Sequence, residues 1–142
     1  MKIVLKRLNQ DFHLEAVNES GNTVHMDASP AIGGGGEGAR PMELLIMGLG
    51  GCSSIDIISI LKKARQPLED LQVEINAERE QGKEPALFTT IHAHYIFIGD
   101  VQESQVKRAL ELSLEKYCSV ARVLEKSATI TWSYEIQGID HE

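Results

Sequence analysis

The sequence predicts an α+β protein with the element order βββαββααβ and no internal repeat. Three observations lead to this prediction: short alternating apolar and polar segments at both ends of the chain, one long and strongly apolar helical pattern between them, and a shorter helical pattern before the last strand. The chain has 142 residues, 42% of them hydrophobic and 25% charged, which is the size and composition of one globular domain. We therefore expect residues 1–142 to form a single domain.

The chain begins with three short extended segments at residues 3–8, 12–17 and 23–26. Turn-forming polar residues separate them, so we expect a three-stranded antiparallel meander. The stretch 29–40 that follows contains five glycines and predicts a mobile loop without a regular element.

A helical pattern runs from Pro41 to about Arg65. Proline is tolerated at the first helical position, Glu43 complements the positive end of the helix, and Lys62 and Lys63 complement its negative end. Apolar residues cover almost every side of this helix, so it must be buried all round. A chain this small cannot cover it alone, and we expect a homodimer whose central helices pack near the interface.

The second half of the chain predicts a hairpin from strands at residues 71–78 and 87–98. A helix follows at residues 104–118, then a short helical segment at 119–126. A last strand at residues 128–136 ends the pattern.

Charge and hydropathy exclude several classes of partner. Fourteen basic residues against 21 acidic ones give a net charge of -7, which disfavours nucleic acid and anionic membrane surfaces. The longest apolar run, residues 44–49, is much shorter than the roughly 20 residues of a membrane span. Lys6 and Arg7 interrupt any apolar core of a secretion signal, so we expect a cytoplasmic protein, and nothing in the sequence calls for a cofactor.

Two cysteines, Cys52 and Cys118, are the main candidates for chemistry. Neither lies in a CxxC motif, so they are either buried core residues or a reactive thiol pair. Local charge favours Cys118 as the thiolate: Asp56 lies one turn from Cys52, whereas Lys116 and Arg122 flank Cys118. If a new short helix begins at Cys118, its free N–H groups add to this effect.

Other motifs give weaker signals. The glycine run lacks the Lys-Ser/Thr ending of a phosphate-binding loop. His92 and His94 share one face of a strand, which is a geometry for metal ligands but equally for a solvated polar face. With no third ligand specified, we expect no metal site.

The chain resembles the OsmC/Ohr family, the osmotically induced and organic hydroperoxide resistance proteins, over nearly its whole length. The resemblance rests on the glycine-rich loop followed by RPMELLIMGLGGCSSIDI and on LSLEKYCSVARVLEK. The sequence motifs GGCS and EKYCSV are most similar to those of a branch of small bacterial OsmC-like proteins. The resemblance implies a single OsmC-like domain with antiparallel sheets around a long buried central helix, and an interlocked homodimer with two sites at its interface.

The resemblance also implies a peroxiredoxin-like antioxidant activity, in which Cys52 attacks an organic hydroperoxide and Cys118 resolves the sulfenic acid as a disulfide. A dithiol reductant, typically a lipoylated protein, then restores the thiols. Hydroperoxide resistance members carry a Glu directly after the proline that corresponds to Pro41. This Glu positions a catalytic Arg. Here Met42 occupies that place and Glu43 comes one residue late. Arg7 is the only Arg before the loop but has no clear register match, and Arg40 and Arg122 are candidate substitutes without motif support. Arg40, Met42 and Glu43 are the candidate substrate-binding residues.

Two function classes therefore remain. The first is a thiol-dependent hydroperoxide reductase that uses the cysteine pair. The second is a non-catalytic OsmC-like dimer that binds a small hydrophobic ligand at the interface, with the cysteines as core residues. Turnover of an organic hydroperoxide with a dithiol distinguishes them.

Overall fold

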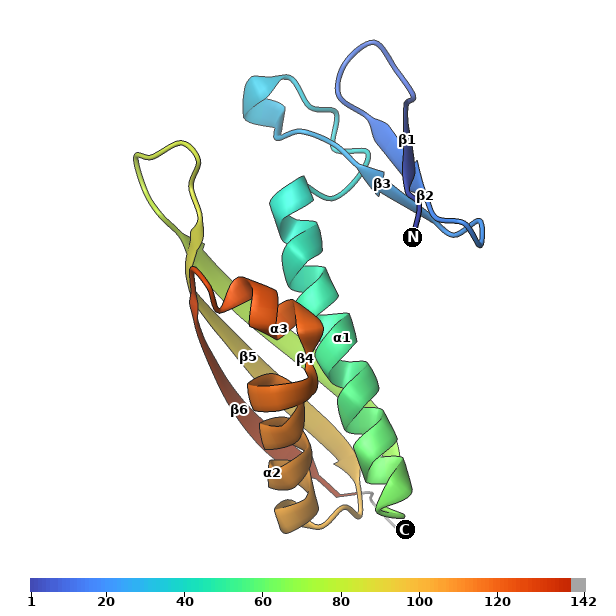
Figure 1. The fold of residues 1–142 in the computed structure, drawn as a ribbon, viewed down its shortest axis with the longest axis vertical. Helices are drawn as coiled ribbons and strands as arrows, with labels where there is room; N and C mark the ends of the chain where they lie inside the picture. Colours follow the sequence, from blue (N-terminus) through green and yellow to red (C-terminus); the bar gives the residue numbers. More distant parts are fainter. Residues whose placement is uncertain (139–142) are drawn as a thin grey trace. The chain divides into compact units, whose positions relative to one another are not determined.

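The secondary structure follows the predicted order βββαββααβ, which confirms the α+β class (Figure 1). The computed structural model describes residues 1–138, which divide into two compact units, Met1–Leu45 and the residues from Ile46 onward. That residues 1–142 form one OsmC-like domain stays a prediction, and its last four residues lie outside the described part of the chain.

The first unit contains the predicted antiparallel meander of β1 (Val4–Arg7), β2 (Leu14–Val17) and β3 (Thr23–Met26). The glycine-rich segment after it is more ordered than expected. A short 3₁₀ helix, η1 (Pro30–Ile32), forms in it because the Ser29 side chain accepts a hydrogen bond from the backbone of Ala31. The prediction of a stretch without any regular element is therefore wrong at this point.

The long helix α1 (Pro41–Lys63) begins at the predicted proline. At its start, the backbone N–H of Arg40 donates to Oε1 of Glu43 over 2.9 Å. The helix ends two residues earlier than predicted, because Arg65 adopts a left-handed conformation with φ 56. The Gln66 N–H then donates to the carbonyl of Leu61, a bond typical of a helix C-terminus.

Within the single chain, α1 is buried along one stripe only. Its buried residues are spaced four apart, at Leu49, Ser53, Ile57 and Leu61. The opposite side exposes 57% of Met47, 70% of Ile55 and 46% of Ile58. The prediction of a helix buried on every side is thus wrong for one chain, and the homodimer that would cover the second face stays a prediction.

By length and composition alone, α1 could also cross a membrane. The predicted apolar run ended at residue 49 because Gly50 and Gly51 interrupt it, but the isoleucines and the leucine at residues 55–61 keep the average hydropathy of the helix high. The core helix of a soluble protein meets the same criterion, so it decides nothing about a membrane.

The second unit is built on a sheet with the order β4–β5–β6, formed by β4 (Leu68–Arg79), β5 (Phe88–Gly99) and β6 (Thr129–Gln137). β4 and β5 are antiparallel, as expected for a hairpin. β5 and β6 are parallel, with Ile91 opposite Ile130. The prediction of antiparallel sheets is therefore wrong for this pair: the helical segment between the two strands is long enough to return the chain to the same end of the sheet.

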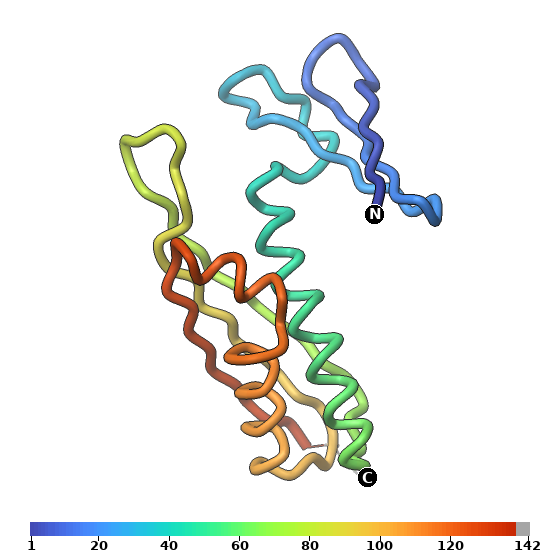
Figure 2. The backbone as a smooth tube through the Cα atoms, viewed as in Figure 1, coloured from blue at the N-terminus to red at the C-terminus, as the bar shows by residue number. Residues whose placement is uncertain are grey.

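That helical segment consists of α2 (Glu103–Leu112), a π-helical turn (Ser113–Tyr117) and α3 (Ser119–Leu124). The tube in Figure 2 changes direction between α2 and α3, where the π turn lies. Together with α1, these helices lie on one face of the sheet (Figure 1). The facing side of β5 forms the core with Ile91, Ala93, Tyr95 and Phe97, each at most 1% exposed.

Candidate functional site

The two cysteines, 66 positions apart in the sequence, meet inside the second unit. Cys52 lies on α1 and is partly exposed, while Cys118 lies at the start of α3 and is fully buried. Both are free thiols, and they lie close enough for Cys52 to influence the pKa of Cys118. The fold therefore brings together the pair that the sequence singled out.

Cys118 is held at the junction between the π turn and α3. Its backbone N–H donates to the carbonyl of Ser113 over 2.7 Å. Its sulfur caps α3 and accepts a hydrogen bond from the N–H of Ala121 over 3.4 Å. The predicted short helix beginning at Cys118 is thus confirmed.

Burial raises the pKa of the Cys118 thiol from 9.0 to about 11, even though the N–H groups of Ala121 and Val120 act in the opposite direction. The neighbouring Cys52 thiol raises the pKa further. The prediction from local charge, that Cys118 is the better thiolate, is wrong, because loss of solvation outweighs nearby charges that sequence spacing can reveal.

The charged neighbours of Cys118 have other partners. Arg122 donates to the carbonyl of Leu114 and its Nε lies 2.9 Å from Glu125 Oε1. The Lys116 ammonium lies over the ring of Tyr117, 5.1 Å from its centroid. Arg122 and Lys116 thus interact with residues of the π turn and α3.

A second pair of buried polar groups lies in the same core. The hydroxyls of Ser53 and Tyr95 are 2.7 Å apart, and both residues are fully buried. Burial raises the pKa of Tyr95 to about 12, against the effect of the Ser53 hydrogen bond. The negative charge that Cys118 would carry as a thiolate also raises it, so the phenol faces the same region as the thiol pair.

Gly50 and Gly51 directly precede Cys52 on α1, and residues without side chains allow a close approach to the helix. The two glycines do line a hollow of about 430 Å³, together with residues of β4. Cys52 is not among the residues that line it, and a side chain at Gly50 would meet Ile75 at 3.3 Å. Within the single chain, the glycines thus open towards β4 rather than towards the thiol.

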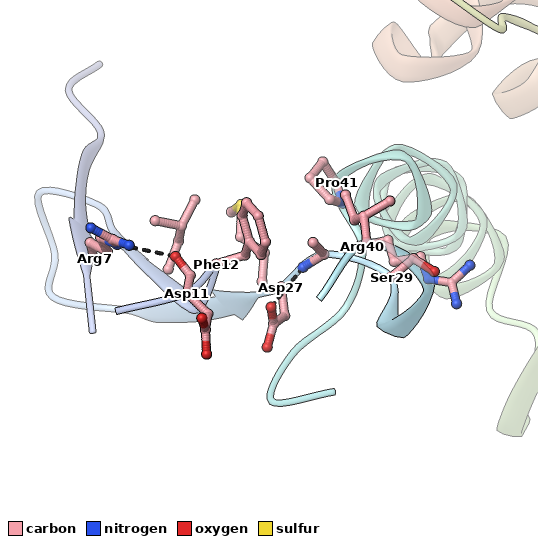
Figure 3. A pocket seen from close by; sticks show the side chains of 11 residues that line it. Arg7, Asp11, Phe12, Asp27, Ser29, Arg40 and Pro41 are labelled. Carbon is pink, nitrogen blue, oxygen red and sulfur yellow. Dashed lines mark hydrogen bonds between the residues drawn. The ribbon is translucent and has the colours of Figure 1, made fainter. Parts of the chain in front are cut away.

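The first unit contains a cavity of about 440 Å³ with an almost entirely apolar lining, which includes Phe12, Leu14, Met26 and Ile32 (Figure 3). Two arginines lie at opposite ends of it in Figure 3, Arg7 and Arg40. Sequence reasoning gave Phe12 and Arg7 no role here, because only the β1–β2 hairpin geometry brings both to one cavity.

The three candidate substrate-binding residues differ in their placement. Arg40 lines the cavity, and Figure 3 shows its guanidinium directed away from Phe12. Met42 and Glu43 do not line it, and the Glu43 carboxylate accepts the Arg40 N–H. Arg7 lines the cavity too, and its guanidinium donates to the carbonyls of Gln10 and Asp11.

The side chain of Asp27 organises the glycine-rich segment beside this cavity. Its carboxylate accepts N–H bonds from Ala28, Gly35 and Glu37 over 2.7–3.2 Å. Burial alone would raise its pKa, but these three bonds and the charge of His13 together lower it. Asp27 is thus an ionised anchor for the loop, a role for which the sequence held no motif.

The two histidines with metal-ligand spacing form hydrogen bonds on the outer face of the second sheet. His92 lies within 2.9 Å of hydroxyls on Thr131 and Ser133, and His94 contacts Ser133 and Glu135. Among residues 1–138, no three His, Cys, Asp or Glu side chains are close enough to hold a metal ion.

The family of the chain follows from the comparison with known proteins. The family described as OsmC-like protein matches residues 34–133, which includes both cysteines. The chain belongs to the OsmC family. Protein YhfA of Escherichia coli strain K12 is 46% identical over 118 residues, which cover 82% of this chain and 84% of that protein.

Solved OsmC-like structures show the same fold. A hypothetical protein from Aquifex aeolicus is 29% identical, with a TM-score of 0.84 over 98% of this chain and 97% of the other. An organic hydroperoxide resistance protein OsmC from Legionella pneumophila is 16% identical, with a TM-score of 0.69 over 95% and 97%. The second likeness supports the OsmC fold only.

Proposed function

We propose that this OsmC-family protein is a thiol-dependent organic hydroperoxide reductase, with Cys52 as the attacking thiol and Cys118 as the resolving thiol. One observation carries the assignment of roles: Cys118 is fully buried, which raises its pKa to about 11, whereas Cys52 is partly exposed. Only the thiolate form of a cysteine is nucleophilic, and an attacking thiol must also be accessible to the substrate.

The reaction balances without a cofactor. The Cys52 thiolate attacks the hydroperoxide and takes its terminal oxygen, the O–O bond breaks, and the departing alkoxide takes a proton to leave as an alcohol. The Cys118 sulfur then attacks the sulfur of the sulfenic acid, and its proton leaves with the hydroxyl group as water. A dithiol reduces the resulting disulfide and is itself oxidised. A lipoylated protein is the reductant that we propose.

We propose that the organic part of the substrate is bound near the start of α1. The apolar cavity in the first unit, of about 440 Å³, supports this because it has the size of a small-molecule site and cationic residues at its edge. In this proposal Arg40 contacts the substrate as part of the cavity lining, and Met42, which does not line the cavity, contacts a part of the substrate that extends beyond it. Glu43 contributes indirectly, because its carboxylate holds the Arg40 backbone.

The same proposal includes a cytoplasmic homodimer. The exposed apolar stripe on α1 supports the dimer, since Met47, Ile55 and Ile58 lie at positions i, i+8 and i+11 on one helix face. Gly51 belongs to the same face, and a side chain there would meet nothing within 4 Å. An exposed apolar stripe of this kind suits packing against a second copy.

The cavity also favours a second candidate function, the binding of a small hydrophobic molecule without turnover. Its lining is almost entirely apolar, and it lies within one unit of the chain. In that case the cysteines serve only as core residues, and hydroperoxide leaves both thiols unchanged.

The test treats wild type, Cys52→Ser and Cys118→Ser with an organic hydroperoxide and measures the intact mass. We expect an intramolecular disulfide in wild type, oxygen addition to Cys52 in Cys118→Ser, and no fast oxidation in Cys52→Ser. A wild-type protein that keeps both thiols under excess hydroperoxide would support the ligand-binding function instead.

A further inference from the structure

Ser113 is a buried hydroxyl at the point where α2 becomes the π turn. Its exposed fraction is 0%, and the buried residues around it in sequence, Ala109, Leu110 and Leu114, are apolar. Such a site destabilises a hydroxyl that has no hydrogen-bond partner. The contacts of Ser113 therefore indicate what the serine is for.

The side chain of Ser113 is attached to α1. Its Oγ lies 3.0 Å from Oδ2 of Asp56 and 3.2 Å from the carbonyl oxygen of Ser53. Ser53 directly follows Cys52, and Asp56 lies one helical turn after Cys52 on the same side of the helix. A serine hydroxyl has one proton to donate, so it serves either acceptor or both at once. Ser113 is thereby bound to the segment that carries the attacking thiol.

The backbone of Ser113 is attached to Cys118. The Cys118 N–H donates to the Ser113 carbonyl over 2.7 Å, and this bond closes the π turn. Cys118 then leaves the helix with φ -71 and ψ 108, and its sulfur turns to cap α3. Turns of this kind occur often at functional sites because they insert one residue and redirect those that follow.

We propose that Ser113 is a positioning residue for the thiol pair, which holds the Cys118 sulfur within reach of Cys52 by fastening the π turn to α1. The reasoning is geometric. A disulfide forms only over a narrow range of separations, and a small misplacement of a reacting group costs much of the rate. Ser113 is the residue whose side chain touches the Cys52 segment while its carbonyl holds Cys118.

This inference rests on the proposed function for its purpose, but its test does not need a hydroperoxide. Oxidised glutathione supplies the first step: the Cys52 thiolate attacks it, forms a mixed disulfide and releases one glutathione thiolate. The Cys118 sulfur then attacks Cys52, the mixed disulfide breaks, and the second glutathione leaves with the Cys118 proton. The ring-closing rate is read from the decay of the mixed disulfide by quenched mass spectrometry.

Three variants separate positioning from general loosening of the core. Ser113→Ala removes the fastening hydroxyl, and Ser113→Thr keeps it. Ser53→Ala is the matched control, because it removes an equally buried hydroxyl but leaves the carbonyl that accepts the Ser113 bond. We expect the disulfide between Cys52 and Cys118 to form about tenfold more slowly in Ser113→Ala than in wild type. This is the factor that corresponds to the loss of one hydrogen bond to a charged group. Ser113→Thr and Ser53→Ala should close at nearly the wild-type rate.

Two results would overturn the proposal: a Ser113→Ala variant that closes as fast as wild type, or equal slowing in Ser53→Ala. If Ser113→Ala does not fold, Asp56 provides the same test. Asp56→Ala should slow closure, whereas Asp56→Asn keeps an acceptor for the hydroxyl and should not. Equal closure rates in these two variants would also refute a positioning role.

The outcomes for Ser113 and for the proposed function are distinguishable. Slow glutathione closure in Ser113→Ala combined with inertness of wild type towards hydroperoxides would support the positioning role and reject the reductase. Normal closure in Ser113→Ala combined with rapid peroxide oxidation of wild type would do the opposite.

Discussion

The exposed stripe on α1 allows a quantitative prediction for Ile55→Glu. Ile55 is 70% exposed, Met47 57% and Ile58 46%. Full burial of such a side chain contributes about 1.5–3 kcal/mol, so covering these exposed fractions would contribute about 3–5 kcal/mol per protomer. A symmetric pair would gain about 5–10 kcal/mol, which is comparable to the cost of association at about 4–15 kcal/mol.

On this basis, the loss of Ile55 from both protomers should weaken the dimer by about 2–4 kcal/mol, before any cost of burying the new carboxylates. The dissociation constant should therefore rise by at least about 30-fold. Sedimentation velocity across a micromolar concentration series measures it. Ser104→Glu is the control, because it adds the same charge to an exposed position of α2 rather than of α1.

The reasoning would be refuted by a wild-type protein that is a folded 15.7 kDa monomer at micromolar concentration. It would also be refuted if Ile55→Glu and Ser104→Glu changed the dissociation constant equally. Because Ile55 is exposed in the single chain, its replacement leaves no cavity there. A loss of stability that depends on protein concentration would therefore itself report the dimer.

Three further predictions concern the interior and the loop. Ser53→Ala should lower the free energy of unfolding in urea by about 1–3 kcal/mol, and Tyr95→Phe should lower it by only about 1 kcal/mol. The difference arises because Tyr95→Phe leaves the Ser53 hydroxyl its hydrogen bond to the Gly50 carbonyl. Equal losses in the two variants would contradict this. The folded-state pKa of Cys118, about 11, exceeds its ordinary value of 9.0, so its contribution to stability is present below pH 9 and is lost as the pH rises through 11. Between these two pH values, the melting temperature should fall more in wild type than in Cys118→Ala. Parallel curves of melting temperature against pH for the two proteins would show that the pKa of Cys118 is not raised. Asp27→Asn should speed limited proteolysis of residues 29–40 severalfold at neutral pH, because the single amide oxygen cannot accept all three N–H bonds. The pKa of Asp27 is lowered, so the wild-type carboxylate stays ionised and keeps the loop anchored until the pH falls below 3.8. Glu37→Gln is the control, because it neutralises a carboxylate on the same loop without removing the Asp27 anchor. The protease should cut this variant at the wild-type rate.

Local patterns predicted most of the secondary structure. Apolar segments and the turn residues between them predicted every strand, and Pro41 predicted the first residue of α1. A short helix starting at Cys118 was expected only if the preceding helix broke after Tyr117, and the structure has Cys118 as the N-cap of α3. These features depend on dihedral preferences and on hydrogen bonds within a few residues, which a single sequence displays directly.

The direction of β6 and the residues that support the thiols could not be predicted in this way. Whether β6 lies parallel or antiparallel to β5 depends on where the crossover helices leave the chain. Ser113 fits the apolar face of its helix by spacing, and its hydroxyl was the one signal that could have marked it. Its partner Asp56 is 57 residues away, and only packing brings them together.

By itself, the sequence determined the α+β class, the order of the elements, the family and the two cysteines of the candidate site. The tertiary structure decided that the pKa of Cys118 is raised, because burial outweighs the charges that lie close in sequence. It also decided which face of α1 is covered within the chain and which stays exposed. Both decisions depend on solvent exclusion, a property of surfaces that form only when distant segments pack together.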